Sequence, residues 1–279
     1  MIALSSTVRP LLGASIVAVL ASCATSEPRA TAVEANVTTR AVGYLQADSV
    51  PDSLSLVPAP PAAGSAGFAL DEQVSREARA LRDTPRFAQA HGDADLSFPD
   101  GASQFSCALD LDVSAQQTPA LYTLLERSRI DASAATKAAK NHYKRPRPFM
   151  VNGEPTCTPE DEPGLRKNGS YPSGHTSIGW AWALILSEIA PDRADAIQAR
   201  GRNYGESRLV CNVHWQSDIL EGRFMGAAAV ARLHDNPAFQ KDLLAARREI
   251  AAARAKGLHA SRDCAAEEAV LKVRPASAL

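Results

Sequence analysis

Apolar residues recur at helical spacing through most of the chain after Phe68. Two stretches that show this spacing are Leu121, Leu124 and Leu125 and, later, Phe239, Leu243 and Leu244. Residues 178–186 are apolar on every side, which predicts a buried central helix. Alanine is abundant and aromatic residues make up 5% of the chain, so the composition favours close-packed helices over sheets. The pattern predicts an all-α fold with one domain.

Segments without this pattern set the expected boundaries. Residues 24–66 are rich in Ala, Ser, Thr, Pro and Val, and we expect a flexible tether there. Residues 149–171 are rich in Pro, Gly, Asn and charged residues, which predicts a long loop of the kind that is often functional. Residues 237–256 carry Arg and Glu at helical intervals and predict a solvated surface helix. The helical domain is therefore expected over residues 67–256, with a C-terminal tail over 257–279.

The first residues are typical of an export signal. Arg9 supplies a cation, and residues 11–20 form an apolar run that is too short to cross a bilayer as a mature helix. The run ends in Leu-Ala-Ser-Cys at residues 20–23, which resembles the bacterial lipobox. We expect a signal peptide over residues 1–23 and a lipidated Cys23, with ordinary signal cleavage as the alternative. The location would be the periplasm, or the outer membrane through a lipid anchor.

Charge and cysteine content narrow the partners and the chemistry. The chain has 30 basic and 31 acidic residues, interspersed, so we expect no nucleic acid-binding surface and place any anion binding in a local cluster. Beyond Cys23, four cysteines remain, an even number that predicts two disulfides in an oxidising compartment. They are Cys107, Cys157, Cys211 and Cys264. No two lie within a few residues of each other, so the sequence predicts no metal site.

A first candidate anion site lies at the start of the apolar helix. Pro172 disfavours helix just before it, and Ser173 is a good N-cap. The free backbone N–H groups of Gly174 and His175 would then lie at a helix N-terminus, where anions bind. The imidazolium of His175 would lie beside such an anion and could protonate a departing alkoxide. Taken alone, a capping serine and a surface histidine would explain this segment.

A second candidate is the segment from Ser207-Arg208 to Asp218. His214 and Asp218 are four residues apart, so on a helix they share a face. Asp218 can accept the Nδ1 proton of His214 and leave its Nε2 nucleophilic. We expect Asn212 to cap that helix, and Arg208 to reach the same anion from the end of the preceding helix.

A third candidate holds two further cations. Lys140 and Arg147 are seven residues apart and would share a face if their helix persisted to Arg145, with Pro146 ending it. Arg147 would then lie in extended backbone between two prolines. Together with Arg208, these cations suit the two negative charges of a phosphate monoester.

The three segments together resemble the signature of the type-2 phosphatidic acid phosphatase and vanadium haloperoxidase superfamily. The motifs are K-x6-R-P, P-S-G-H and S-R-x5-H-x3-D, and every fixed position is present. The register is unambiguous, because the competing Arg145-Pro146 pair has Ala138 where the lysine should be. Residues 168–171, 179–180 and 214–218 look like the soluble class A bacterial non-specific acid phosphatases, and the resemblance covers residues 68–249.

The resemblance implies a helical-bundle domain of the acid phosphatase and vanadium haloperoxidase type. It implies a periplasmic enzyme that acts on a broad range of phosphomonoesters at acidic pH, with no cofactor. By position, His214 would be the nucleophile that forms a phosphohistidine, Asp218 would orient it, and His175 would be the general acid that later activates water. The residues implied to stabilise the equatorial oxygens are Lys140, Arg147, Ser173, Gly174 and Arg208.

The resemblance also bears on the cysteines. The loops with Cys157 and Cys211 flank the second and third motifs and should converge on the pocket. This favours a Cys157–Cys211 disulfide and leaves Cys107–Cys264 to fasten the tail. Residues 91–95 look superficially like metal ligands but predict a surface turn, and Lys144 and Arg145 predict either a positive rim or two solvated charges.

Three other functions stay open on the sequence. A vanadium haloperoxidase would use the same pocket, and a lipid or prenyl-diphosphate phosphatase would act at the membrane to which Cys23 is attached. A non-catalytic phosphate-binding lipoprotein would need the cations but not His214 with its orienting carboxylate. The sequence leaves the preferred phosphoester and a homo-oligomeric state open.

Overall fold

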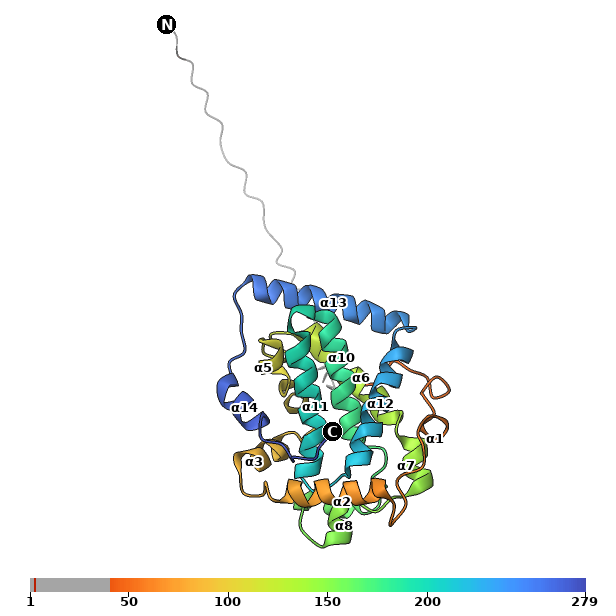
Figure 1. The fold of residues 1–279 in the computed structure, drawn as a ribbon. Helices are drawn as coiled ribbons and strands as arrows, with labels where there is room; N and C mark the ends of the chain where they lie inside the picture. Colours follow the sequence, from red (N-terminus) through yellow and green to blue (C-terminus); the bar gives the residue numbers. More distant parts are fainter. Residues whose placement is uncertain (1–2, 4–40) are drawn as a thin grey trace, which may run out of the picture. The chain divides into compact units, whose positions relative to one another are not determined.

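A computed structural model describes residue 3 and residues 41–279, and all regular elements of this part of the chain are helices (Figure 1). This confirms the predicted all-α fold. The longer helices are α2 (Ala66–Arg79), α3 (Pro85–Gly92), α6 (Pro119–Ala134), α10 (Gly174–Ile189), α11 (Ala194–Val210), α12 (Gln216–Leu233), α13 (Pro237–Ala255) and α14 (Cys264–Leu271). The short ones are α1 (Ser53–Leu56), α4 (Asp100–Ser103), α5 (Ser106–Leu109), α7 (Lys137–Tyr143), α8 (Pro148–Asn152), α9 (Glu162–Leu165) and the 3-10 turns η1 (Pro159–Asp161) and η2 (Pro191–Arg193).

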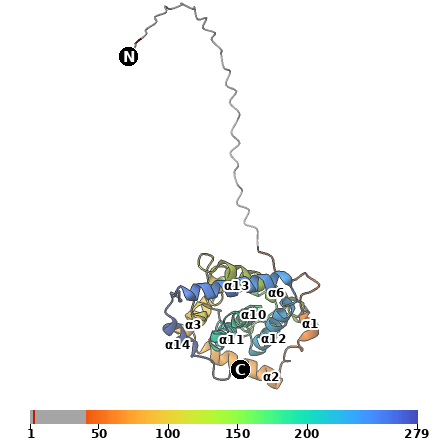
Figure 2. The ribbon, with the colours of Figure 1, turned by 90° about the horizontal axis from the view of Figure 1, so that it is seen from above.

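Helix α10 is the central helix that the apolar run predicted. It packs mainly on α11, α12 and α6, and Figure 2 shows it inside a ring of other helices. Trp182 is fully buried, and its indole N–H donates to the carbonyl of Leu125 on α6 over 3.0 Å. Small residues allow the closest approach, because a Cβ on Gly179 would overlap the ring of Tyr204 on α11. Burial on all sides explains why this helix has no polar face.

Helices α6 and α13 carry the two leucine-rich patterns seen in the sequence. Leu121, Leu124 and Leu125 of α6 are fully buried. On α13, Phe239 and Leu243 are buried, whereas the adjacent Leu244 is 48% exposed, one position beyond the buried stripe. Helix α13 crosses one end of α10, α11 and α12, and α2 and α8 lie at the opposite end (Figure 1). It is the surface helix that its charge pattern predicted.

Residues 41–279 belong to one compact unit. Within residues 41–66, which we expected in the tether, Tyr44 and Val57 are buried, and the hydroxyl of Tyr44 donates to Asp242 on α13 over 2.8 Å. Within the expected tail, α14 packs beside α3, and Arg274 pairs with the buried Glu206 over 2.6 Å. Sequence composition alone did not reveal these long-range anchors.

The expected signal peptide, the lipidated Cys23 and residues 24–40 of the expected tether lie outside the described residues. Among the helices of the described part, none has both the length and the apolar composition needed to cross a membrane.

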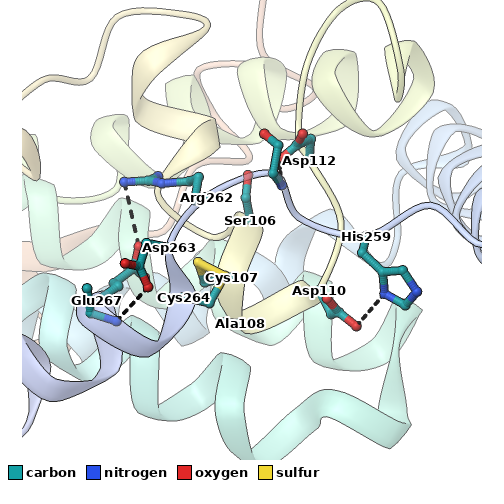
Figure 3. Close-up of a disulfide and its surroundings, with 12 residues drawn as sticks. Ser106, Cys107, Ala108, Asp110, Asp112, His259, Arg262, Asp263, Cys264 and Glu267 are labelled. Carbon is teal, nitrogen blue, oxygen red and sulfur yellow. Dashed lines mark hydrogen bonds and ion pairs between the residues drawn. A yellow bond between two sulfur atoms is a disulfide. The ribbon is translucent and has the colours of Figure 1, made fainter.

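The four other cysteines pair as predicted. Cys157 is bonded to Cys211, and Cys107 to Cys264. The second bond joins α5 to the start of α14, where Arg262 also pairs with Glu267 over 3.6 Å (Figure 3). The C-terminal tail is therefore fastened to the helical bundle by a covalent link and by ion pairs.

Candidate active site

The start of α10 has the predicted capped geometry. Ser173 is the N-cap, and its hydroxyl accepts from the backbone N–H of Thr176 over 3.3 Å. Gly174 and His175 are the first two helical residues, so their N–H groups belong to the unpaired first turn. The backbone N–H of Ser173 donates to the carbonyl of Asp218 over 2.9 Å, which joins the second and third motifs directly.

His214 lies just before a helix rather than on it, and the prediction that Asn212 caps this helix was wrong. Helix α12 begins at Gln216 with Trp215 as its N-cap, while Asn212 has a positive φ of 61° in the turn after α11. Asp218 caps the helix by accepting the N–H of Trp215 over 2.8 Å. The same Oδ2 lies 3.2 Å from Nδ1 of His214, so the predicted pair forms by another local route.

The hydrogen bonds of His214 fix its tautomer. Nη1 of Arg147 lies 3.1 Å from Nε2 of His214, and a guanidinium can only donate. Nε2 therefore accepts, and Nδ1 carries the proton toward Asp218. Burial, followed by the charges of Arg147, Lys140 and Arg208, lowers the pKa of His214 well below its ordinary value. The ring is thus neutral, with its Nε2 lone pair on the side of the cations.

The first motif supplies two buried cations. Helix α7 ends at Tyr143, earlier than Pro146 required, because Lys144 takes a left-handed conformation. Arg147 lies in extended backbone as predicted, with φ −79° and ψ 156°. Nζ of Lys140 donates to the carbonyls of Gly169 at 2.9 Å and Ser170 at 3.2 Å. Burial, and then the charge of Arg147, lowers the pKa of Lys140 to about 7.

Arg208 provides a guanidinium that forms no ion pair with any residue in the described part of the chain. Its side chain is 2% exposed, and its Nε and Nη1 make no hydrogen bond within the described part of the chain. Burial lowers its pKa to about 10. Because a buried unpaired charge is costly, a bound anion is the natural partner for these two donors. The second motif lies beside the first, since a Cβ on Gly174 would lie 3.7 Å from Cε of Lys140.

His175 faces the same group of charges. Its Nε2 lies 2.8 Å from the carbonyl of Ala94, so Nε2–H is the donor and Nδ1 is the other ring nitrogen. Burial lowers its pKa well below the ordinary value. The charge of Arg208, and then those of His214 and Arg147, lower this pKa further. Direct contacts also join the motifs, because Nη1 of Arg147 lies 3.1 Å from Nε2 of His214 and the N–H of Ser173 donates to the carbonyl of Asp218. The structure therefore brings together residues from all three motifs.

Arg145 is an important residue whose setting the sequence left open. It is neither on a positive rim nor solvated: its guanidinium is buried between Asp218 at 2.7 Å and Asp71 at 2.6 Å. Asp71 also accepts from the hydroxyl and the backbone N–H of Ser217, both at 2.7 Å. The sequence offered one hint, the arginine just inside the first motif. Nothing local marked Asp71, which lies on α2.

Residues 91–95 end α3 in a turn at the surface, as expected, but the carboxylate of Asp93 within it points inward. Asp93 is fully buried and pairs with Arg200 of α11, and His91 contacts the carbonyl of Cys157. The buried carboxylate of Asp93 is tolerated because the guanidinium of Arg200, far away in sequence, neutralises it. Among the described residues, no three or more His, Cys, Asp or Glu side chains are grouped so that they could hold a metal ion.

This bundle and its site define a known class, since residues 122–239 match the family described as the PAP2 superfamily. The matched segment contains all three motifs. The chain is 46% identical to the non-specific acid phosphatase of Providencia stuartii over 209 residues, which are 75% of this chain and 84% of the relative. It is 42% identical to that of Salmonella typhimurium (70% and 78% covered) and 40% identical to an acid phosphatase of Zymomonas mobilis (73% and 77% covered). The chain belongs to the non-specific acid phosphatases of the PAP2 superfamily, which confirms the resemblance seen in its motifs.

Proposed function

We propose that this chain is an acid phosphatase that hydrolyses phosphomonoesters through a phosphohistidine on His214. The observation that carries the proposal is the placement of His214, whose Nε2 lies 3.1 Å from Nη1 of Arg147 and whose Nδ1 lies 3.2 Å from Oδ2 of Asp218. A phosphate-binding protein would need the cations but not an oriented imidazole. Family membership and the names of the relatives support hydrolysis of phosphomonoesters.

In the first step, the lone pair of His214 Nε2 forms a bond to phosphorus while the bond to the alcohol oxygen breaks. Binding of the phosphate dianion favours uptake of a proton on Nδ1 of His175, and in this step His175 gives that proton to the departing oxygen, so that the alcohol leaves neutral. In the second step, His175 takes a proton from water, the water oxygen attacks phosphorus, and the bond to Nε2 breaks. Inorganic phosphate leaves, and both histidines return to their starting states.

The proposed stabilising groups meet the charge of the phosphoryl group. Lys140, Arg147 and Arg208 face its equatorial oxygens, and the hydroxyl of Ser173 and the N–H of Gly174 add neutral donors. Each such donor typically contributes a factor of roughly 10²–10³ in rate. Burial, and then the same cations, lower the pKa of His214, which favours the unprotonated nucleophile.

The proposal is tested by trapping the intermediate. Enzyme mixed with radiolabelled phosphomonoester and quenched in base should carry acid-labile label on His214, and His214→Ala should lose both label and activity. His142→Ala is the matched control, because His142 is an exposed histidine at the end of α7. His175→Asn, given p-nitrophenyl phosphate, should accumulate label because its second step lacks a base. A fully active His214→Ala variant contradicts the mechanism.

A haloperoxidase assay checks the main alternative within the superfamily. Purified protein should hydrolyse p-nitrophenyl phosphate without oxidising bromide when vanadate and peroxide are supplied. If the protein oxidised bromide and showed no phosphatase activity, it would be a haloperoxidase, and the proposed reaction would be wrong.

We also propose that the chain is exported and anchored through a lipid on Cys23. The apolar run at residues 11–20 and the lipobox-like residues 20–23 support this, and two disulfides fit an oxidising compartment. Expression of the full chain should place it in the membrane fraction, with a lipid mass on the peptide that begins at Cys23. Cys23→Ser should release it, and equal release of both proteins would contradict the anchor.

A further inference from the structure

We infer that Asp93 is a positioning residue for His175, acting through the carbonyl of Ala94. The inference rests on the proposed function, because it concerns the step in which His175 protonates the leaving group. It also gives a role to Ser207, the fixed serine of the third motif, which the mechanism above does not use.

The carboxylate of Asp93 is held on several sides. It follows directly after α3 and is fully buried. It accepts from the hydroxyl of Ser207 and from the guanidinium of Arg200, both on α11. It also accepts from Nε2 of Gln89, one turn earlier on α3, over 2.9 Å. Both helices therefore fix the position of this carboxylate.

Arg200 is itself held firmly. Its side chain is 2% exposed, and its Nε donates to the carbonyl of Gln104 over 2.9 Å. The same Nε lies 3.5 Å from the carboxylate of Glu267 on α14, the helix fastened by the Cys107–Cys264 disulfide. Two carboxylates thus share one buried arginine, and the one on Asp93 is the nearer partner.

One peptide unit connects this cluster to the active site. Ala94 follows Asp93, and its carbonyl accepts the Nε2–H of His175 over 2.8 Å. The N–H of Ala94 donates to the carbonyl of His91, so the backbone here forms a closed turn. The peptide unit between Asp93 and Ala94 is planar, so a fixed Asp93 limits the movement of the Ala94 carbonyl to rotations at the Cα of Ala94. The position of Asp93 therefore decides where the acceptor for His175 lies.

That acceptor selects which ring nitrogen handles the proton. With Nε2–H committed to Ala94, the nitrogen left for proton transfer is Nδ1, which makes no hydrogen bond to any residue that the structure describes. If the carbonyl shifted, the ring could rotate or exchange tautomers, and Nδ1 would lose its alignment with the leaving oxygen. Ser207 donates to Asp93 rather than to the phosphate site, so it would act through the same path.

A general acid matters only when the leaving group needs a proton. p-Nitrophenolate departs readily without one, whereas an alkoxide does not, so the two substrates separate the contribution of His175 from all other effects. The quantity to compare is kcat/KM, because it reports the step that expels the leaving group and is unaffected by the later hydrolysis of the phosphoenzyme.

The experiment measures kcat/KM of Asp93→Asn for p-nitrophenyl phosphate and for an alkyl phosphate such as glycerol 2-phosphate. We expect a loss of about 10–100-fold for the alkyl phosphate and a much smaller loss for the aryl ester, as part of the 10²–10⁴-fold effect of a general acid. In a His175→Asn background, adding Asp93→Asn should cost nothing further for the alkyl phosphate. Asp242→Asn is the matched control, because Asp242 also pairs with an arginine, Arg127, over 3.0 Å. Asp242 lies on α13, which is at the end of the bundle opposite to α2 and α8 (Figure 1).

Ser207→Ala provides an independent variant in case Asp93→Asn does not fold, because it leaves the Asp93–Arg200 pair in place. Its kcat/KM should again fall more for the alkyl phosphate than for the aryl ester, but by a smaller factor than in Asp93→Asn. Equal losses for both substrates, or a full further loss in the His175→Asn background, would overturn the inference and leave Asp93 purely structural. Failure of the proposed function looks different: wild-type enzyme would then form no phosphohistidine with either substrate.

Discussion

Arg145 donates to the carboxylate of Asp218 over 2.7 Å, so the residue that orients His214 is itself held by a buried ion pair. Arg145→Gln should lower kcat about 10–100-fold, the usual cost of removing a group that orients an active-site residue, and leave KM nearly unchanged. It should also lower the free energy of unfolding by about 3–5 kcal/mol, because it strands two buried carboxylates. Lys144→Gln, at the exposed neighbour, should change neither. Steady-state kinetics and urea unfolding check both outcomes.

The pKa of Lys140 predicts how activity depends on pH. Below a pKa of about 7 the side chain is an ammonium that attracts the phosphate, and above it the charge is lost. We therefore expect kcat/KM to fall as the pH rises through about 7. The corresponding fall, or basic limb, of the kcat profile should lie at higher pH, because bound phosphate favours the charged form of Lys140. Lys140→Met should lower kcat/KM by roughly 10²-fold and remove this limb. An unchanged limb in that variant would assign it to another group.

The low pKa of His175 predicts proton uptake when an anion binds. Burial and the charge of Arg208 keep the free imidazole neutral, and a bound dianion would offset that charge and raise the pKa. Sulfate is the suitable probe, because it stays a dianion at acidic pH and contributes no protons of its own. Calorimetry of sulfate binding in two buffers of different ionisation enthalpy should show net proton uptake. His175→Asn should reduce it, and an identical uptake in the variant would exclude His175 as the acceptor.

The two disulfides should separate stability from activity. Cys107–Cys264 spans 157 residues and Cys157–Cys211 spans 54, so chain entropy predicts losses of about 5 and about 4 kcal/mol when each is removed. Replacing both cysteines of the first pair by serine should lower the melting temperature and preserve kcat/KM, since this bond lies at α14 (Figure 3). The same change in the second pair should lower both, because Cys211 lies between Arg208 and His214 in the third motif.

The helices and the motif residues were predictable because their causes are local. A run of apolar residues on every side requires burial, and Ser173 before Gly174 predicts a capped helix whatever surrounds it. Cysteine pairing followed from the positions of the motifs, since loops that meet at one pocket bring Cys157 and Cys211 together.

The wrong prediction of a helix cap at Asn212 also had a local cause. Asn212 is a common capping residue, but it adopts a left-handed turn, and Trp215 takes the N-cap position because Asp218 reaches back to its N–H. The pairing of His214 with Asp218 survived this error, since four residues keep the two groups close in either backbone path.

By itself, the sequence determined which residues carry charge, a nucleophile or a cap, since these depend on residue type and on neighbours a few positions away. Only the tertiary structure decided that Arg145 lies between Asp71 and Asp218, and that the carbonyl of Ala94, the residue after Asp93, contacts His175. These partners are 74, 73 and 81 positions apart along the chain (145 − 71, 218 − 145 and 175 − 94). Such contacts are required because a buried charge or polar group is costly without its partner, and no local pattern encodes which distant residue provides it.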